Sequence, residues 1–338
     1  MTTNSMNRRT FVGSAVALAA LGIPRVSAAA ALEAFNITIT HYPGQDYALP
    51  VVVAQELGYM AQAGIDVKSI VGSSGGGTTV RNISQGGLRV GEAATSAVIK
   101  AILSGIDLKI VAAGVQSPGT ICWVSKKDSP IKTIHDLAGK RIGFSAPGSV
   151  SESLLHMSLS AASVDTSKIT FKAAGGLGEN LTLLDTNGLD CAFTVDPLLT
   201  RNQSKLHVVF FAKEYVPRYL QTVWVAGPSV LQEQKDKIAA FIAARGRGLD
   251  AIIKDPHTAA NIFAKVTNAD PGITYTTLEH EKPEDYFSHG RLDPKALQLV
   301  VDGMRIGKLI GPEKVPVGSM IDDTLLVASE RAAMPAQM

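Results

Sequence analysis

Short apolar segments of strand composition alternate along most of the chain with segments of helical periodicity. Such alternation is typical of parallel sheets covered by helices on both faces, so the sequence predicts an α/β fold. In the first part of the chain we expect strands at residues 36–40, 66–71, 88–94 and 108–113. Further along we expect strands at residues 120–125, 141–145, 168–174, 190–195, 206–211 and 222–226.

The length of 338 residues exceeds what one hydrophobic core usually organises, so two lobes are expected. The pattern changes at residues 116–119, where a strand leaves the first lobe, and a later strand returns the chain. We predict that residues 31–119 and 223–338 form lobe 1 and that residues 120–222 form lobe 2. Additional helices are expected from Ser229, at 258–266, after Asp293 and at 321–327.

Residues 1–30 have the composition of an export signal and are left out of the predicted fold. Arg8 and Arg9 precede an apolar run that is too short to span a bilayer, and small residues near Ala28 form a cleavage pattern. The paired arginines followed by Phe11 resemble a twin-arginine signal. An ordinary secretory signal with a basic start is the alternative, and both predict that the mature protein works in the periplasm.

The net charge argues against two classes of partner. The whole chain carries +2, but three arginines lie within the first 28 residues, where there is no acid, so the remainder carries −1. A nearly neutral protein has no electrostatic basis for binding nucleic acid or an anionic membrane.

Cys122 and Cys191 are the two cysteines, and both lie in short apolar strands. They could pair in an oxidising compartment, although buried free thiols are commoner in such strands. With no histidine pair nearby they predict no zinc site.

The stretch from Pro130 to Leu155 predicts a strand, a tight turn and the start of a helix. Ser149 and Glu152 have the spacing of a capping box, which would open that helix. The N–H groups at a helix start attract a small anion or hydrogen-bond acceptor. Alternatively, Ser149 and Glu152 themselves satisfy these groups.

Three segments resemble the sulfonate/nitrate/taurine-type solute-binding proteins of ABC importers, a family that includes binders of thiamine pyrimidine precursors. They read VVVAQELGYMAQAGIDVKSI, KKDSPIKTIHDLAGKRIGFSAPGS and GLDCAFTVDP. The resemblance spans residues 36–256. It implies a periplasmic binding protein of type II, with two doubly wound lobes joined by two hinge strands. It further implies a monomer that hands a small-molecule ligand to an ABC transporter permease in the inner membrane.

The loops at strand ends are the expected ligand contacts, because α/β sheets bind ligands there. The candidate ligand-binding residues are Tyr42, Gln45, Tyr47, Thr95, Ser96, Ser145, Ser149, Asn180, Asp196 and Trp224. These loops contain no Arg or Lys. We therefore expect a small organic anion, sulfonate- or carboxylate-like, held by hydroxyls, amides and helix N-termini.

A nitrogen heterocycle is the alternative ligand. Asp46 and Asp196 could bind an amine-bearing ring between tyrosines, although Asp before a helix is usually a cap. The first loop lacks the tryptophan expected of thiamine-precursor binders. Trp224 could reach the cleft or simply pack at the hinge.

We find no catalytic constellation and expect neither an enzyme nor a cofactor or metal site. Histidines are scattered, with His280 and His289 near acids. A pyrimidine-synthesis enzyme, which consumes its own histidine and requires iron, belongs to the resembled family and is the runner-up. The export signal argues against it. A periplasmic sensor module would share the same fold.

Overall fold

The computed structural model describes residues 33–85, 87, 88 and 90–338. The predicted export signal lies outside this range. Within it, none of the helices has the length and apolar character needed to cross a membrane.

A five-stranded sheet with the order β2-β1-β3-β10-β4 forms the centre of the first lobe. Its strands are β1 (Glu33–Thr40), β2 (Ile65–Ser73), β3 (Val90–Ala94), β4 (Lys109–Ala113) and β10 (Thr222–Ala226). β1 pairs in parallel with β2 and β3, whereas β10 lies antiparallel between β3 and β4. The strands predicted for this part of the chain are confirmed, with shifts at their ends.

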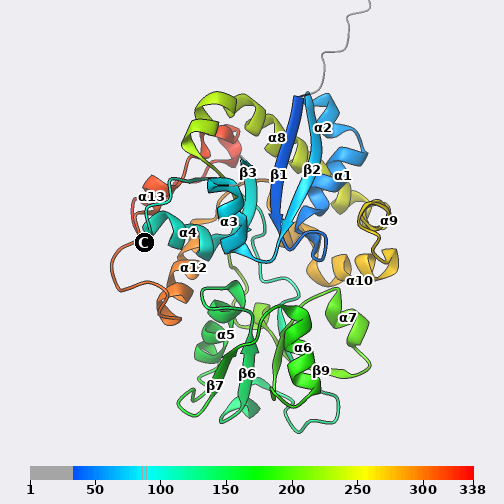
Figure 1. Cartoon of the computed structure of the whole chain (residues 1–338), viewed down its shortest axis with the longest axis vertical. Helices are drawn as coiled ribbons and strands as arrows, with labels where there is room; N and C mark the ends of the chain where they lie inside the picture. The colour runs from blue at the N-terminus through cyan, green and yellow to red at the C-terminus, as the bar shows by residue number, and fades with distance from the viewer. Residues whose placement is uncertain (1–32, 86, 89) are drawn as a thin grey trace, which may run out of the picture. The chain divides into compact units, whose positions relative to one another are not determined.

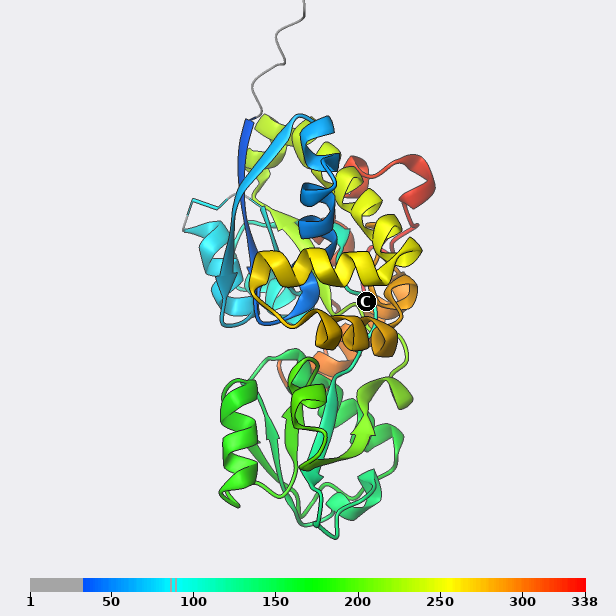
Figure 2. The same ribbon diagram turned by 90° about the vertical axis from the view of Figure 1, so that its right-hand side faces the viewer.

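Both faces of this sheet are covered, as the alternating side chains of β10 show. Val223 and Val225 pack against α3 (Gly76–Ser84) and α4 (Thr95–Leu103). Trp224 and Ala226 point to the other face, which is covered by α1 (Leu49–Glu56), α8 (Pro228–Lys254) and α9 (Pro256–Thr267). Figure 1 labels these elements, and Figure 2 separates α1 and α3 onto opposite sides of the strands. The short helix α2 (Tyr59–Gln62) follows α1.

The second lobe is built around β5 (Cys122–Lys126), and Figure 1 shows most of it in green. Its other strands are β6 (Arg141–Phe144), β7 (Thr170–Ala173), β8 (Ala192–Thr194) and β9 (Leu206–Phe211). β5 lies between β8 and β9, while β6 and β7 form a parallel pair. Its helices are α5 (Val150–Ala161), α6 (Leu177–Asp185) and α7 (Leu198–Asn202).

Trp123 anchors the core of the second lobe. Its ring stacks on Phe210 with centroids 5.0 Å apart, and its indole N–H donates to the carbonyl of Gly143 at 2.9 Å. Cys122 and Cys191 are buried free thiols in the same lobe. Burial raises the pKa of both thiols, so they are protonated and unreactive.

Two chain crossings join the lobes, one after β4 and one before β10, and hydrogen bonds hold them together. The backbone N–H of Gln221 donates to the carbonyl of Val115 at 2.8 Å. The hydroxyl of Thr222 accepts from the N–H of Val115 at 2.8 Å and lies 2.5 Å from Oε1 of Glu92, to which it donates. Glu92 is fully buried, and this burial raises its pKa to about 7.

The C-terminal part contains the largest differences from prediction. It forms α10 (Pro271–Glu281), α11 (Pro283–Tyr286), α12 (Pro294–Ile306) and α13 (Val317–Met320). The predicted helix after Asp293 is confirmed as α12. The helix predicted at 321–327 is wrong, because Ile321 bridges to Ile110 in β4 and leaves only a short 3-10 turn at Asp323–Leu325. Sequence periodicity predicted neither α10 nor α11.

Candidate ligand site

The loop after β1 places three side chains of the candidate site in a buried position. Gln45, Asp46 and Tyr47 are 6%, 8% and 7% exposed, whereas Tyr42 is half-buried. Asp46 begins a 3-10 turn that leads into α1, and Pro50 in the first turn fixes the start of that helix. The hydroxyl of Tyr47 accepts from Nε2 of Gln221, next to β10, at 3.0 Å.

Asp46 forms a carboxyl pair with Glu281, the last residue of α10. The two groups are hydrogen-bonded, and Tyr286 in α11 also hydrogen-bonds to Asp46. Burial is the main cause that raises the pKa of each acid, and the negative charge of Asp196 raises both further. Burial, the charge of Asp46 and the bond between the acids together raise the pKa of Glu281 well above its usual range, whereas the same bond acts to lower the pKa of Asp46. Glu281 therefore holds the proton and donates it to Asp46.

The pair is linked to the second lobe through Thr120 and Asp196. The hydroxyl of Thr120 donates to Oε1 of Glu281 at 3.4 Å and accepts from the backbone N–H of Asp196 at 3.1 Å. Oδ1 of Asp196 caps α7 through the N–H and hydroxyl of Thr200, at 2.9 and 2.7 Å. Its other oxygen, Oδ2, lies 3.0 Å from Nδ1 of His280. The capping role weighed for Asp196 is thus present together with a contact to α10.

Several acceptor atoms around the pair have no hydrogen-bond partner among the described residues. They are Oδ2 of Asp46, Oε2 of Glu281, Oε1 of Gln45 and Oε1 of Gln221. A buried polar atom without a partner costs about 1–3 kcal/mol. All four atoms accept hydrogen bonds, so a group that supplies N–H or O–H donors would satisfy them.

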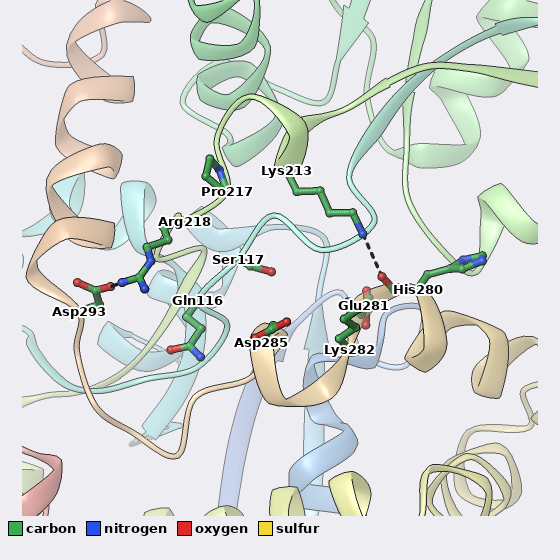
Figure 3. Close-up of a pocket in the computed structure, with 10 residues that line it drawn as sticks. All are labelled: Gln116, Ser117, Lys213, Pro217, Arg218, His280, Glu281, Lys282, Asp285 and Asp293. Carbon is green, nitrogen blue, oxygen red and sulfur yellow. Dashed lines mark hydrogen bonds and ion pairs between the residues drawn. The ribbon is translucent and has the colours of Figure 1, made fainter.

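A hollow of about 440 Å³ lies beside the pair, next to both crossings (Figure 3). It is lined by Gln116, Ser117, Lys213, Pro217, Arg218, His280, Glu281, Lys282, Asp285 and Asp293. Two of the cationic side chains that line it already have partners. Arg218 bonds to Asp293 at 2.9 Å, and Nζ of Lys213 donates to the carbonyl of His280 at 3.0 Å. Glu281 therefore connects the acid pair to an open space.

Thr95 and Ser96 begin α4 as helical residues, with Ala94 as the preceding cap position. Neither side chain caps the helix, because neither bonds to the backbone of the first turn. Ser96 instead donates to the carbonyl of Gly148 at 3.2 Å, which joins the first lobe to the turn before α5. The buried hydroxyl of Thr95 has no partner in the described part of the chain.

The start of α5 satisfies its own donors. Ser149 Oγ accepts from the N–H of Glu152 at 3.2 Å, and the Glu152 carboxylate accepts from the N–H of Gly148 at 2.7 Å. Ser145 bonds to the hydroxyl of Ser151 through both its N–H and its own hydroxyl. The predicted capping spacing is confirmed, and Glu152 occupies an N–H that was proposed to receive an anion.

Asn180 and Trp224 lie in packed surroundings. The Asn180 side chain donates to the carbonyls of Gly175 and Gly176 at 3.0 and 3.1 Å and lies against Gly143. Trp224 is fully buried, packs edge-on against Phe241 of α8 and lies beside Arg245. The expected contact between Trp224 and a solute therefore has no support in this structure, because α8 covers the ring.

Sequence reasoning missed Glu281, Gln221, Thr120 and Tyr286. All four come from the crossings or from α10 and α11, and no local spacing relates them to Asp46. Among the described residues, His, Cys, Asp and Glu form no group of three or more that could hold a metal ion.

The sequence profile of the family described as NMT1/THI5 like matches residues 45–259, well over half of the chain. The chain belongs to this family. No curated protein matches the sequence. The NMT1/THI5-like segment begins at Gln45 within the first loop, includes the second lobe and β10, and ends before Glu281.

Solved structures extend the likeness of this NMT1/THI5-like chain to its fold. It resembles the periplasmic aliphatic sulphonate binding protein SsuA of Escherichia coli, with a TM-score of 0.71, 18% identity and coverage of 90% of this chain and 96% of that one. It is equally similar to the alkanesulfonate-binding SsuA of Xanthomonas axonopodis pv. citri bound to MOPS, with a TM-score of 0.71, 18% identity and coverage of 88% and 98%. The desulfurization enzyme DSZB also shares the fold, with a TM-score of 0.61, 15% identity and coverage of 87% and 97%. The periplasmic-binding-protein fold predicted from the sequence is confirmed.

Proposed function

We propose that this protein captures a small solute between its two lobes and delivers it to the permease of an ABC importer. The observation that carries the proposal is the meeting of strand-end loops from both lobes. The hydroxyl of Ser96 donates to Gly148, and Asp196 contacts His280 across the same boundary. Two hydrogen-bonded crossings join lobe 1, of about residues 31–119 and 223–338, to lobe 2, of about residues 120–222. This arrangement is suited to hinge closure.

We propose that the protein acts in the periplasm without turning over its solute. The composition of residues 1–30 supports export, and twin-arginine transport is the favoured route. Structurally similar proteins named as binders of aliphatic sulfonates support the transport role. Because the DSZB enzyme has the same fold, catalysis is the competing function. The test must therefore detect chemical conversion of the solute as well as its binding.

For the ligand we weigh two classes. A small organic anion is supported by the sulfonate-binding proteins of this fold and by the unpartnered hydroxyl of Thr95. However, the N–H of Gly148 at the start of α5 already bonds to Glu152. A nitrogen-bearing solute, such as a heterocycle, is supported by the buried pair of Asp46 and Glu281, and we rank it first.

The test is a thermal-shift screen of the exported protein against sulfonates, carboxylates, nitrate, purines and aminopyrimidines. A specific ligand stabilises by RT ln(1 + [L]/Kd), about 2.7 kcal/mol at a hundredfold excess over Kd. Small-angle scattering should show compaction with the same solute, and mass spectrometry should recover it unchanged. Chemical conversion of the bound solute would replace the binding role by an enzymatic one.

A further inference from the structure

The carboxyl pair of Asp46 and Glu281 is an unusual feature for a purely structural contact. The side chains come from opposite parts of the chain, the turn before α1 and the end of α10, and both residues are less than one-tenth exposed. In the described part of the chain, neither acid hydrogen-bonds to a lysine or an arginine. Two buried acids without a cation partner are unfavourable, so one must keep its proton.

The protonated pair still carries one negative charge. Glu281 donates its proton to Asp46, which also bonds to Tyr286, and Thr120 donates to Glu281. Apart from the hydrogen bond between the two acids, Oδ2 of Asp46 and Oε2 of Glu281 have no partner in the described chain. The pair therefore carries one negative charge, and few donors surround it.

Two glutamine side chains provide an independent indication of the missing chemistry. Gln45 precedes Asp46, and Gln221 bonds through its amide nitrogen to Tyr47. Burial raises the pKa of Tyr47 well above its usual range, and the charge of Asp46 raises it further. Both glutamines are less than one-tenth exposed, and Oε1 of each has no partner in the described residues. The local surroundings thus lack donors and contain surplus acceptors.

A space large enough for a small solute also lies next to one member of the pair, Glu281. Glu281 lines the 440 Å³ hollow between the crossings and α10, where Figure 3 shows it beside Lys213 and Asp285. Arg218 and the ammonium of Lys213 bond to Asp293 and to the carbonyl of His280. Neither cation is bonded to the acid pair.

We propose that Asp46 and Glu281 recognise a protonated or N–H-rich nitrogen group of the solute, such as an amine, an amidine or an amino-substituted heterocycle. This inference rests on the proposed binding function and adds the two residues that recognise the nitrogen-bearing solute and the group that they bind. The nitrogen group donates to carboxyl oxygens of the pair and to the glutamine carbonyls, and its positive charge offsets the charge of the pair. An anion would be repelled at this position.

The test uses single-ring probes that differ only in their charged group. Benzylamine, benzamidine and an aminopyrimidine form the nitrogen set, and benzenesulfonate and benzoate form the anion set. Binding is measured by calorimetry and thermal shift for the wild type, Asp46→Asn, Glu281→Gln and the control Glu284→Gln, which changes an exposed acid in α11. We expect the nitrogen set to bind the wild type and control, and each site variant to lose at least tenfold in affinity.

The unliganded proteins separate recognition from support of the fold. If the pair serves recognition, Asp46→Asn and Glu281→Gln remain folded and melt at or above the wild-type temperature, because each removes charge repulsion. Nitrogen probes that bind the site variants as well as the control would overturn the proposal, whatever the melting temperatures. Stabilisation by anions alone would also overturn it while leaving the binding function intact. If neither probe set nor the wider solute screen stabilises the wild type, the binding function itself fails.

Discussion

The Nδ1 atom of His280 in α10 lies 3.0 Å from Oδ2 of Asp196, whose side chain is completely buried at the start of α7. A second pair in the same protein has nearly the same geometry, since Nε2 of His289 lies 2.9 Å from Oδ1 of Asp250. In that pair both side chains are exposed, at 42% and 67%. The two histidine–aspartate contacts therefore have similar chemistry but differ in the burial of the aspartate, so comparing them measures the effect of that burial on stability.

We predict that His280→Ala lowers the free energy of unfolding by about 1–3 kcal/mol, because it leaves a buried carboxylate oxygen of Asp196 without its partner. The matched variant His289→Ala should cost less than about 1 kcal/mol, as exposed ion pairs do. Urea unfolding of both variants at the same pH measures the difference. Equal losses would mean that the contact to the second lobe contributes no more than a surface pair.

Stability should fall as the pH rises from 5 to 8, in part through Glu92. Native Glu92 keeps its proton up to about pH 7, whereas the unfolded chain loses it near the ordinary value of 4.5. Between these values the native state binds more protons, so the free energy of unfolding decreases with pH and levels off above pH 7. The shift corresponds to about 3 kcal/mol.

Glu92→Gln should remove this contribution, so the variant should lose about 3 kcal/mol less than the wild type between pH 5 and pH 8. Asp46 and Glu281 remain and give the variant a residual slope in the same direction. The control Asp190→Asn should keep the full wild-type slope, because Arg141 lowers the pKa of Asp190 below its ordinary 3.8. An unchanged slope in Glu92→Gln would contradict the assignment.

Two serines have the sequence spacing of helix caps, but the structure assigns the role to only one. Ser149 accepts from the N–H of Glu152, whereas Ser229 is exposed within the first turn of α8, after the cap position at Gly227. Ser149→Ala should therefore cost about 1 kcal/mol, and Ser229→Ala less than about 0.5 kcal/mol. Thermal denaturation of the two variants tests this, and the reverse order would show that α8 begins at Ser229.

Two glycines in α8 should respond oppositely to alanine. A Cβ at Gly248 would lie 2.1 Å from the backbone carbonyl of Pro50 in α1, whereas one at Gly246 would meet its nearest atom, in His289, at 3.5 Å. Gly248→Ala should destabilise by about 2 kcal/mol or more, because α1 and α8 must separate. Gly246→Ala should stabilise by about 0.5–1 kcal/mol through helix propensity. Chemical denaturation of both variants checks the sign of each change.

The predicted elements that depend on strong periodicity were found, while those held by tertiary contacts were not. Strands such as β3 and β10 have apolar runs that local pattern detects. The segment Pro271–Glu281 has few apolar residues at helical spacing. Periodicity therefore predicted neither α10 nor the contact of Glu281 with Asp46. For Trp224 in β10, contact with the cleft and packing at the hinge were both left open, because local sequence does not distinguish a covering helix from a bound solute. The pairing of Asp46 with Glu281 depends on the whole fold, since nothing in the neighbourhood of either residue indicates the other.

The position of β10 between β3 and β4 has a consequence for the order of folding. This interior strand is synthesised only after the entire second lobe, so a nascent chain that ends before Thr222 cannot join β3 to β4. The second lobe, by contrast, has all of β5 to β9 by Phe211. Assembly on the ribosome should therefore begin with the inserted lobe, and the lobe that contains β1 should be completed last.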